Sequence, residues 1–187
     1  MKQTYKPAKS REKLALTVGQ QRQLVDMAEG KTKALLVLML STGMHPAILS
    51  DKNSKGRRGT YQLQWSDDYY MFLRTKTLKK IRGAWSPAMK EPLMLENLYR
   101  CRRRTPQRYW QMLNELGKEC KISGLCPLQL RHTYFVNRAR LGVNAWNISQ
   151  GAKTSIDTIN DFYMLGSNEM KQLSDEDTTW LKWLMGD

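Results

Sequence analysis

The stretch KTKALLVLMLSTG, residues 31–43, limits what this chain can fold into more than any other part of the sequence. From Ala34 onward its side chains are apolar on almost every face of a helix, and the run stops at Gly43, a residue type that commonly ends helices. Other elements have to cover such a helix on most sides. We therefore expect a central buried helix in one globular domain, which 187 residues with 41% hydrophobic content can supply.

The segments on either side of this helix predict a further helix and a small sheet. In TVGQQRQLVDMAEG, Thr17 and Gln20 have the spacing of a capping box, and the pattern predicts a helix that continues until Gly30. Two β-rich runs flank a Ser-Asp-Asp turn in GTYQLQWSDDYYMFLRTKT, and IRGAWSP offers a third strand. The expected fold class is mainly α with a small antiparallel β-sheet, an α+β arrangement.

The second half of the chain predicts a series of helices. EPLMLENLYRCRRR is helical in pattern, and Thr105 with Pro106 predicts the cap and first turn of the next helix. Three further helices are expected at about 127–141, ended by Gly142, at about 144–150, ended by Gly151, and at about 155–163, capped by Thr154.

The acidic tail SDEDTTWLKWLMGD predicts one more short helix. Ser174 and Asp177 have capping spacing, and an acidic first turn suits a helix N-terminus. The apolar residues Trp180, Leu181, Trp183 and Leu184 crowd onto this helix. It must therefore dock somewhere, either on its own body or on a neighbouring subunit.

Several functional classes receive no support from the sequence. No apolar run reaches the roughly 18 residues needed to cross a bilayer, and the N-terminus lacks the apolar segment of a secretory signal. Cys101, Cys120 and Cys126 fit neither a disulfide framework nor, with only two histidines, a zinc site. We expect a soluble cytoplasmic protein with idle thiols, no membrane contact, no metal and no other cofactor.

The charge balance points to a polyanionic partner. The chain has 31 Lys and Arg against 17 Asp and Glu, a formal net charge of +14. Basic residues gather in DKNSKGRRG, RTKTLKKIRG and RCRRRTPQR, beside turns or helix ends rather than along one membrane-type helix. This pattern predicts nucleic-acid binding; a merely soluble cationic surface is the alternative.

Three segments in a fixed order resemble the catalytic domain of tyrosine recombinases and phage-type integrases. They are STGMHPAIL at residues 41–49, RTKTLKKIRG at 74–83, and LQLRHTYFVNRARLGVNAWNISQGAKTSIDTINDFY at 128–163. The most specific part is Leu-Arg-His-Thr on a helix, followed by a Leu-Gly helix stop and a short helix that ends in glycine. The resemblance covers about residues 15–165 and implies the fold of that domain.

The resemblance also implies a reaction. In this family a tyrosine attacks a DNA phosphodiester, two arginines and a histidine or tryptophan hold the phosphate oxygens, and a lysine protonates the leaving hydroxyl. Arginine suits the task because its planar fork grips two phosphate oxygens and stays charged. Arg131 matches the second arginine, and Lys76 matches the lysine. The alternatives are a structural arginine that pairs with a carboxylate or helix carbonyls, and a solvated lysine.

Other positions depart from the family pattern. His45 stands where the family has an arginine, and Leu128 stands where it has a histidine. Lys153 replaces a histidine or tryptophan, and Phe162, which has no hydroxyl, occupies the position of the nucleophile. Tyr163 lies one residue later, about 100° around a helix, so it could act only if that helix were shifted or irregular. The matched catalytic set is therefore incomplete.

The predicted function is DNA binding by a recombinase-like domain that has lost most catalytic residues, because affinity built on many phosphate contacts survives loss of the nucleophile. An active recombinase that uses Tyr163 and a basic RNA-binding protein stay open as alternatives. The expected partner is duplex DNA, with a homo-oligomer or a recombinase partner held through the C-terminal helix. The expected DNA contacts are Arg57, Arg58, Arg74, Lys76, Lys79, Lys80, Arg131 and Lys153.

Three parts are expected along the chain. They are a basic segment at 1–14, the recombinase-like domain at 15–165, and an acidic tail with a short amphipathic helix at 166–187. Family recombinases carry a separate N-terminal helical domain that closes a clamp around DNA, whereas this chain begins near the first helix of the catalytic domain. We expect either a fragment or a protein that binds one face of DNA, in the nucleoid of a bacterial, archaeal or virus-infected cell.

Overall fold

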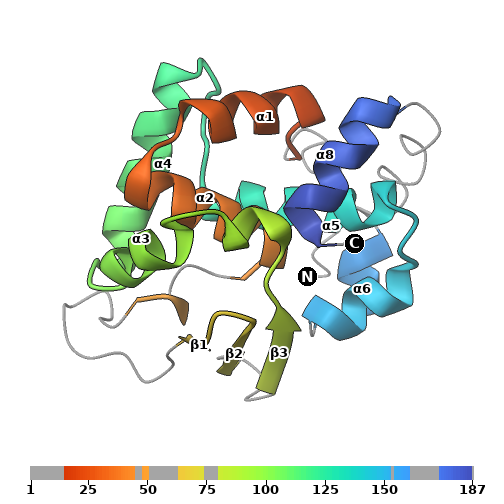
Figure 1. Ribbon diagram of the computed structural model, residues 1–187. Coiled ribbons are helices and arrows are strands. Elements are labelled where there is room, and N and C mark those ends of the chain that lie inside the picture. The colour runs from red at the N-terminus through yellow and green to blue at the C-terminus, as the bar shows by residue number, and fades with distance from the viewer. Residues whose placement is uncertain are drawn as a thin grey trace, which may run out of the picture.

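The structure is a computed structural model that describes residues 15–44, 48–50, 63–73, 80–152, 154–160 and 173–186. Within these residues the fold is mainly helical, and a three-stranded antiparallel sheet lies at one edge of the helical body (Figure 1). This confirms the predicted α+β class. The elements are α1 Val18–Met27, α2 Gly30–Thr42, β1 Gln64–Trp65, β2 Tyr69–Leu73, β3 Lys80–Ala84, the 3₁₀ helix η3 Pro87–Lys90, α3 Met94–Cys101, α4 Pro106–Glu119, α5 Pro127–Arg140, α6 Ala145–Ala152 and α8 Asp175–Met185. Residues 156–160 are also helical.

Helix α2 is the buried centre of the fold, as its all-round apolar sequence predicts. Every side chain from Ala34 to Ser41 is buried, and α1, α3, α4, α5, α8 and η3 all pack against it. The helix ends at Gly43, which adopts the left-handed conformation with φ 61° and donates its N–H to the carbonyl of Met39. The direction in which the chain leaves α2 is therefore fixed, and the buried helix holds the residues at its C-terminal end in place.

The sheet has the strand order β1-β2-β3 with antiparallel pairing throughout. Tyr70 is paired with Gly83, and Phe72 with Ile81, on the face that turns toward the helices. The side chains of β3 alternate between exposed and half-buried, so one face packs and the other is open. All three strands lie where the aromatic and β-rich runs predict them.

Helix α5 is joined to the start of α1 by a buried polar network. The N–H of Leu16 donates to Thr133 Oγ1 at 3.0 Å, and Gln21 and Asn137 exchange two amide hydrogen bonds at 3.2 and 2.7 Å. Arg140 adds donors to Leu16 O at 3.2 Å and Asn137 Oδ1 at 2.9 Å. Because an unpaired buried polar group is costly, this satisfied network holds α5 in one position against the N-terminal segment.

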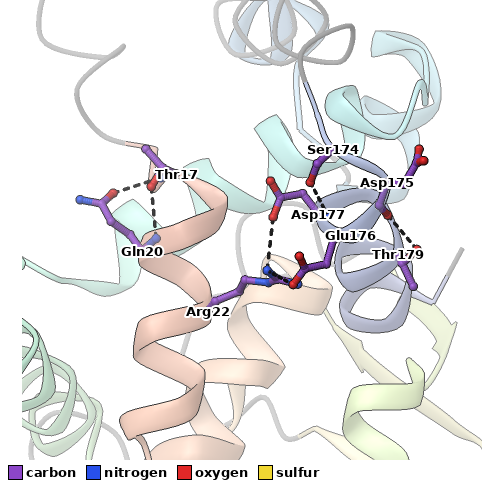
Figure 2. A network of polar contacts seen from close by, with 8 residues as sticks. All are labelled: Thr17, Gln20, Arg22, Ser174, Asp175, Glu176, Asp177 and Thr179. Atoms are coloured by element: carbon purple, nitrogen blue, oxygen red, sulfur yellow. Dashed lines mark hydrogen bonds and ion pairs between the residues drawn. The ribbon is translucent and has the colours of Figure 1, made fainter.

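Helix α8 packs on the body of its own chain. Leu181 and Leu184 are fully buried, and the helix contacts η3, α2 and α5. Figure 2 shows Arg22 of α1 reaching across to two carboxylates in the first turn of α8, with distances of 2.7 Å to Glu176 and 3.6 Å to Asp177. Of the two docking modes predicted for this helix, the structure contains the one on its own body. Contact with a neighbouring subunit stays a prediction.

Three helix ends differ from the sequence-based prediction. Gly30 does not end the preceding helix but is the first residue of α2, and Gly151 lies inside α6 rather than after it. Ser155, not Thr154, caps the last short helix, because its Oγ accepts the N–H of Thr158 at 3.3 Å. The N–H of Thr154 is already used by the carbonyl of Ser149 at the end of α6. Which residue begins, caps or ends a helix therefore depends on contacts with neighbouring parts of the chain, and not on the residue type alone.

Candidate nucleic-acid interface

The predicted site residues are unevenly covered by the structure. Arg131, Leu128 and Lys80 lie within the described residues. The others lie outside them, namely His45, Arg57, Arg58, Arg74, Lys76, Lys79, Lys153, Phe162 and Tyr163. The geometry therefore concerns the surroundings of Arg131 and the open face of the sheet, and the roles assigned to the remaining residues stay predictions.

Arg131 lies on α5 and joins that helix to the end of α2. Its guanidinium donates a hydrogen bond to the carbonyl of Gly43, 88 residues away in the sequence. The same guanidinium lies 5.0 Å from the ring centroid of Phe135, one helical turn further along α5. A carbonyl on one side and a ring on the other restrict the side chain, so Arg131 is held in place and not a freely moving surface arginine.

Tyr134 brings the two helices into close contact beside Arg131. A β-carbon built on Gly43 would lie 2.4 Å from Cδ1 and 2.8 Å from Cγ of the Tyr134 ring, closer than real contacts allow. Two features therefore favour a glycine at position 43: its positive φ, and the Tyr134 ring that leaves no room for a β-carbon. Two neighbouring residues of α5 thus converge on one glycine at the end of α2, one through a hydrogen bond and one through packing.

Tyr70 makes a similar close contact inside the sheet, between β2 and β3. A β-carbon on Gly83 would lie 2.5 Å from the Tyr70 hydroxyl oxygen, so the ring of β2 lies across β3. The ring also packs against Trp85 at 4.8 Å between centroids. Burial is the main cause that raises the pKa of Tyr70 far above its ordinary value; Tyr134 raises it further, and Arg138 lowers it. Tyr70 of β2 and Tyr134 of α5 are both partly buried and pack against the same hydrophobic core.

The open face of the sheet carries cationic side chains. Lys80 begins β3 and is exposed, and Arg82 is exposed two residues later on the same face. The Arg82 guanidinium lies 4.3 Å from the centroid of Tyr69, an outward-facing residue of β2. Arg82 was not among the predicted DNA contacts, although the period of two that places Lys80 outward also places Arg82 outward.

Two other residues of the LQLRHT motif have different surroundings. Leu128, three residues before Arg131 in the position of the family histidine, is 55% exposed. A leucine offers neither a donor nor an acceptor there, so it can contribute only apolar surface. Thr133 is fully buried; it accepts from Leu16 N and donates to Gln129 O at 2.9 Å. Thr133 is therefore a hydrogen-bonding residue of the core.

Within the described ranges, no helix has both the length and the apolar character that crossing a bilayer demands. In the same ranges, no three His, Cys, Asp or Glu side chains come together in a way that could hold a metal ion. Around Arg131 and on the open face of the sheet, the side chains named above present guanidinium and ammonium cations with aromatic rings beside them.

Comparisons with known proteins identify the fold. No protein-family model and no curated protein sequence matches the chain. A crystal structure of the XerH site-specific recombinase, bound to its palindromic difH substrate in a post-cleavage complex, matches 84% of this chain with a TM-score of 0.62 and 10% identity. A crystal structure of XerA recombinase matches 97% of this chain with a TM-score of 0.54 and 17% identity. This chain spans 51% of the XerH chain and 64% of the XerA chain.

The two recombinase structures and this chain share their fold. A central buried helix, a small antiparallel sheet and an arginine-bearing helix packed against the C-terminal end of the central helix occur together here. The chain has the fold of a tyrosine recombinase catalytic domain.

Proposed function

We propose that this protein binds duplex DNA, on the face formed by the end of α2, the sheet and α5, and does not cleave it. The observation that carries the DNA-binding part of the proposal is the position of Arg131. The structure joins it to Gly43, so the LQLRHT segment meets the STGMHPAIL segment in space as the recombinase resemblance requires. An arginine fixed by a carbonyl and a ring can meet a phosphate without first losing side-chain freedom.

The charges of the molecule support the backbone of DNA as the target. Phosphate contacts supply most of the affinity of proteins for DNA, and they position the protein without reading bases. Lys80 and Arg82 give the open face of the sheet two cationic side chains, and the whole chain has a formal net charge of +14. Such a surface also speeds association with a polyanion.

The residues at the family positions argue against strand cleavage. Leu128 is an exposed leucine where a proton-handling histidine is needed, and Phe162 has no hydroxyl where the nucleophile is needed. Loss of one preorganised charge-stabilising donor typically costs about 3–4 kcal/mol of transition-state stabilisation. Several such losses together would remove most of the catalytic advantage, whereas DNA affinity, spread over many contacts, would persist.

The salt dependence of DNA binding tests the binding proposal. Affinity for a duplex of arbitrary sequence should fall steeply with salt, since each phosphate contact contributes about −0.9 to the slope of log K against log salt. Arg131→Gln should weaken binding to all sequences and make that slope shallower by about one. Lys118→Gln, an equal loss of charge on an exposed residue of α4, is the matched control and should leave the slope unchanged.

A flat response to salt would refute duplex binding. An effect of Arg131→Gln on one DNA sequence alone would refute the assignment to the backbone. Arg131 also supports Gly43, so circular dichroism melting of each variant has to show a folded protein at the temperature of the binding assay. Binding of structured RNA in preference to duplex DNA at equal salt would favour the RNA-binding alternative instead.

A covalent trapping assay separates a binder from a recombinase. The protein is incubated with nicked duplexes that would trap a phosphotyrosyl intermediate, and the products are run on a denaturing gel. We expect no shifted band over long incubation, because the trap accumulates the product of even a slow enzyme. A band that disappears in Tyr163→Phe would establish the active recombinase that uses Tyr163 and would refute the loss of catalysis.

A further inference from the structure

A second cluster of basic side chains lies at the other end of α2. A pocket of about 630 Å³ opens there, lined by Lys31, Glu96, Tyr99, Arg100, Arg103 and Arg104. We call it the α3 pocket. Lys31 is the second residue of α2 and Gly43 follows its last, so at 1.5 Å per residue the two ends lie roughly 18 Å apart. The α3 pocket is therefore separate from the face that carries Arg131.

The charge of the α3 pocket is strongly positive. Its lining contains four cationic side chains and one carboxylate, and that carboxylate, on Glu96, is paired with Arg100 one turn along α3. Among the described residues, no carboxylate lies within ion-pair distance of Lys31, Arg103 or Arg104. An anion that enters the pocket would meet these charges without displacing a carboxylate of the described residues, and a concave cationic surface raises the local concentration of anions.

An aromatic ring lies next to these cations. Tyr99 is 50% exposed, which leaves part of its aromatic ring open to solvent. Trp65 of β1 contacts it edge to face, with 6.4 Å between ring centroids. The guanidinium of Arg102 lies 5.3 Å from the Trp65 ring and 5.5 Å from the Tyr99 ring, and that of Arg103 lies 6.0 Å from Tyr99. The pocket thus combines a half-open planar apolar surface with guanidinium groups around it.

The backbone that carries these side chains is firmly anchored. Cys101, in the middle of the run, is fully buried, and the hydroxyl of the buried Tyr109 donates to its carbonyl at 3.0 Å. Ser50 Oγ donates to the carbonyl of Arg104 at 2.6 Å. The arginine residues on either side of Cys101 therefore project from a fixed chain. A site on a fixed backbone has less ordering entropy to lose when it binds a ligand.

We propose that the α3 pocket binds a nucleotide with an accessible base, the phosphate among Lys31, Arg103 and Arg104 and the base stacked on Tyr99. Proteins that bind single strands combine cations along the backbone with aromatic rings under the bases. The pocket volume falls within the range of sites for small ligands, roughly 300–1,000 Å³. Duplex DNA keeps its bases paired inside, so it could use the cations of this pocket and not the ring. A free mononucleotide and a nucleotide within a single strand offer the same chemistry.

Fluorescence anisotropy with a labelled single-stranded hexathymidylate tests the proposal. Tyr99→Ala should weaken binding about 5- to 150-fold, the range for loss of one base stack, while Tyr99→Phe, which keeps the ring, should bind like the wild type. Arg103→Gln should weaken binding and reduce its salt dependence. Trp110→Ala removes a ring of equal exposure, 49%, from outside the pocket, and Lys118→Gln removes a charge there; both should bind like the wild type.

Competition with unlabelled ligands identifies the source of the nucleotide. Displacement by thymidine monophosphate as effective as by hexathymidylate would identify a free nucleotide, and displacement by the strand alone would identify single-stranded nucleic acid. Inorganic phosphate that competes as well as thymidine monophosphate would overturn the contact with the base. Equal losses in Tyr99→Ala and Trp110→Ala, or none in either folded variant, would overturn the site. Duplex affinity, measured separately with Arg131→Gln, reports on the other face and is expected not to change in Tyr99→Ala.

Discussion

Replacement of Gly43 with alanine should destabilise the protein by two separable effects. Gly43 has φ 61°, and an L-residue in the left-handed region costs about 1–2 kcal/mol. The new methyl group would also lie 2.4 Å from Cδ1 of Tyr134, so the ring has to move out of its packed position. Forced repacking of this kind costs about 1–3 kcal/mol. The sum, about 2–5 kcal/mol, is a large part of the roughly 5–15 kcal/mol that holds a typical domain together.

Two other glycines of the chain separate these effects. Gly124 has φ 73° and open space within 4 Å of the point where a β-carbon would stand, so Gly124→Ala should show the conformational cost alone, about 1–2 kcal/mol. Gly151 lies inside α6 with ordinary φ and open space, so Gly151→Ala should stabilise the protein by about 0.5–1 kcal/mol. The three variants add the same methyl group, and only its surroundings differ.

Urea unfolding followed by circular dichroism measures all three. The midpoint should fall most in Gly43→Ala, less in Gly124→Ala, and rise in Gly151→Ala, with the slope of free energy against urea unchanged. The reasoning fails if Gly43→Ala and Gly124→Ala lose the same free energy, since that would show that the Tyr134 ring yields without cost. Because Arg131 donates to the carbonyl of the same residue, Gly43→Ala should also weaken duplex binding, in the same direction as Arg131→Gln.

Three further predictions concern other parts of the fold. Tyr109→Phe removes one of two donors to the buried carbonyl of Cys101, the other being the N–H of Arg104 at 3.0 Å, and should cost about 0.5–1.5 kcal/mol in urea unfolding, whereas Tyr99→Phe on the surface should cost almost nothing. Burial raises the pKa of the Cys101 thiol to about 12, so the unfolded chain loses this proton first; stability should fall as pH rises above 9, and less in Cys101→Ala. Arg22→Ala removes ion pairs to α8 that are partly exposed, so thermal melting should show a loss of about 1 kcal/mol or less, smaller still in high salt.

Local sequence signals were sufficient to predict the main elements. The apolar run after Ala34 has no polar face, and a helix of that kind is stable only when it is covered, so its burial could be predicted without the structure. The cap at Thr17 is a short-range geometry within four residues, and the structure contains both of its hydrogen bonds. Glycine is less informative, because the residue type that ends α2 at Gly43 also begins α2 at Gly30 and lies inside α6 at Gly151.

The contacts of the site could not be derived from local pattern. Nothing near Gly43 in the sequence indicates that Tyr134 and Arg131, about ninety residues later, would contact it. Only the collinear resemblance to recombinases suggested that the two segments meet. Arg82 could have been found from the alternation of β3, and the α3 pocket from the basic and aromatic run around Tyr99, which was recognised as basic but not as a pocket.

The role of Arg131 in the structure changes what its presence means for catalysis. An arginine at the family position suggests phosphate chemistry when only the sequence is known. The hydrogen bond to Gly43 and the contact with Phe135 give the same side chain a structural function, one that would favour an arginine even in a chain that never cleaves DNA. Its presence is therefore compatible with both functions and cannot separate a binder from an enzyme. That distinction depends on the nucleophile, for which the hydroxyl of Tyr163 is the candidate beside Phe162, and a trapped covalent intermediate is the measurement that detects it.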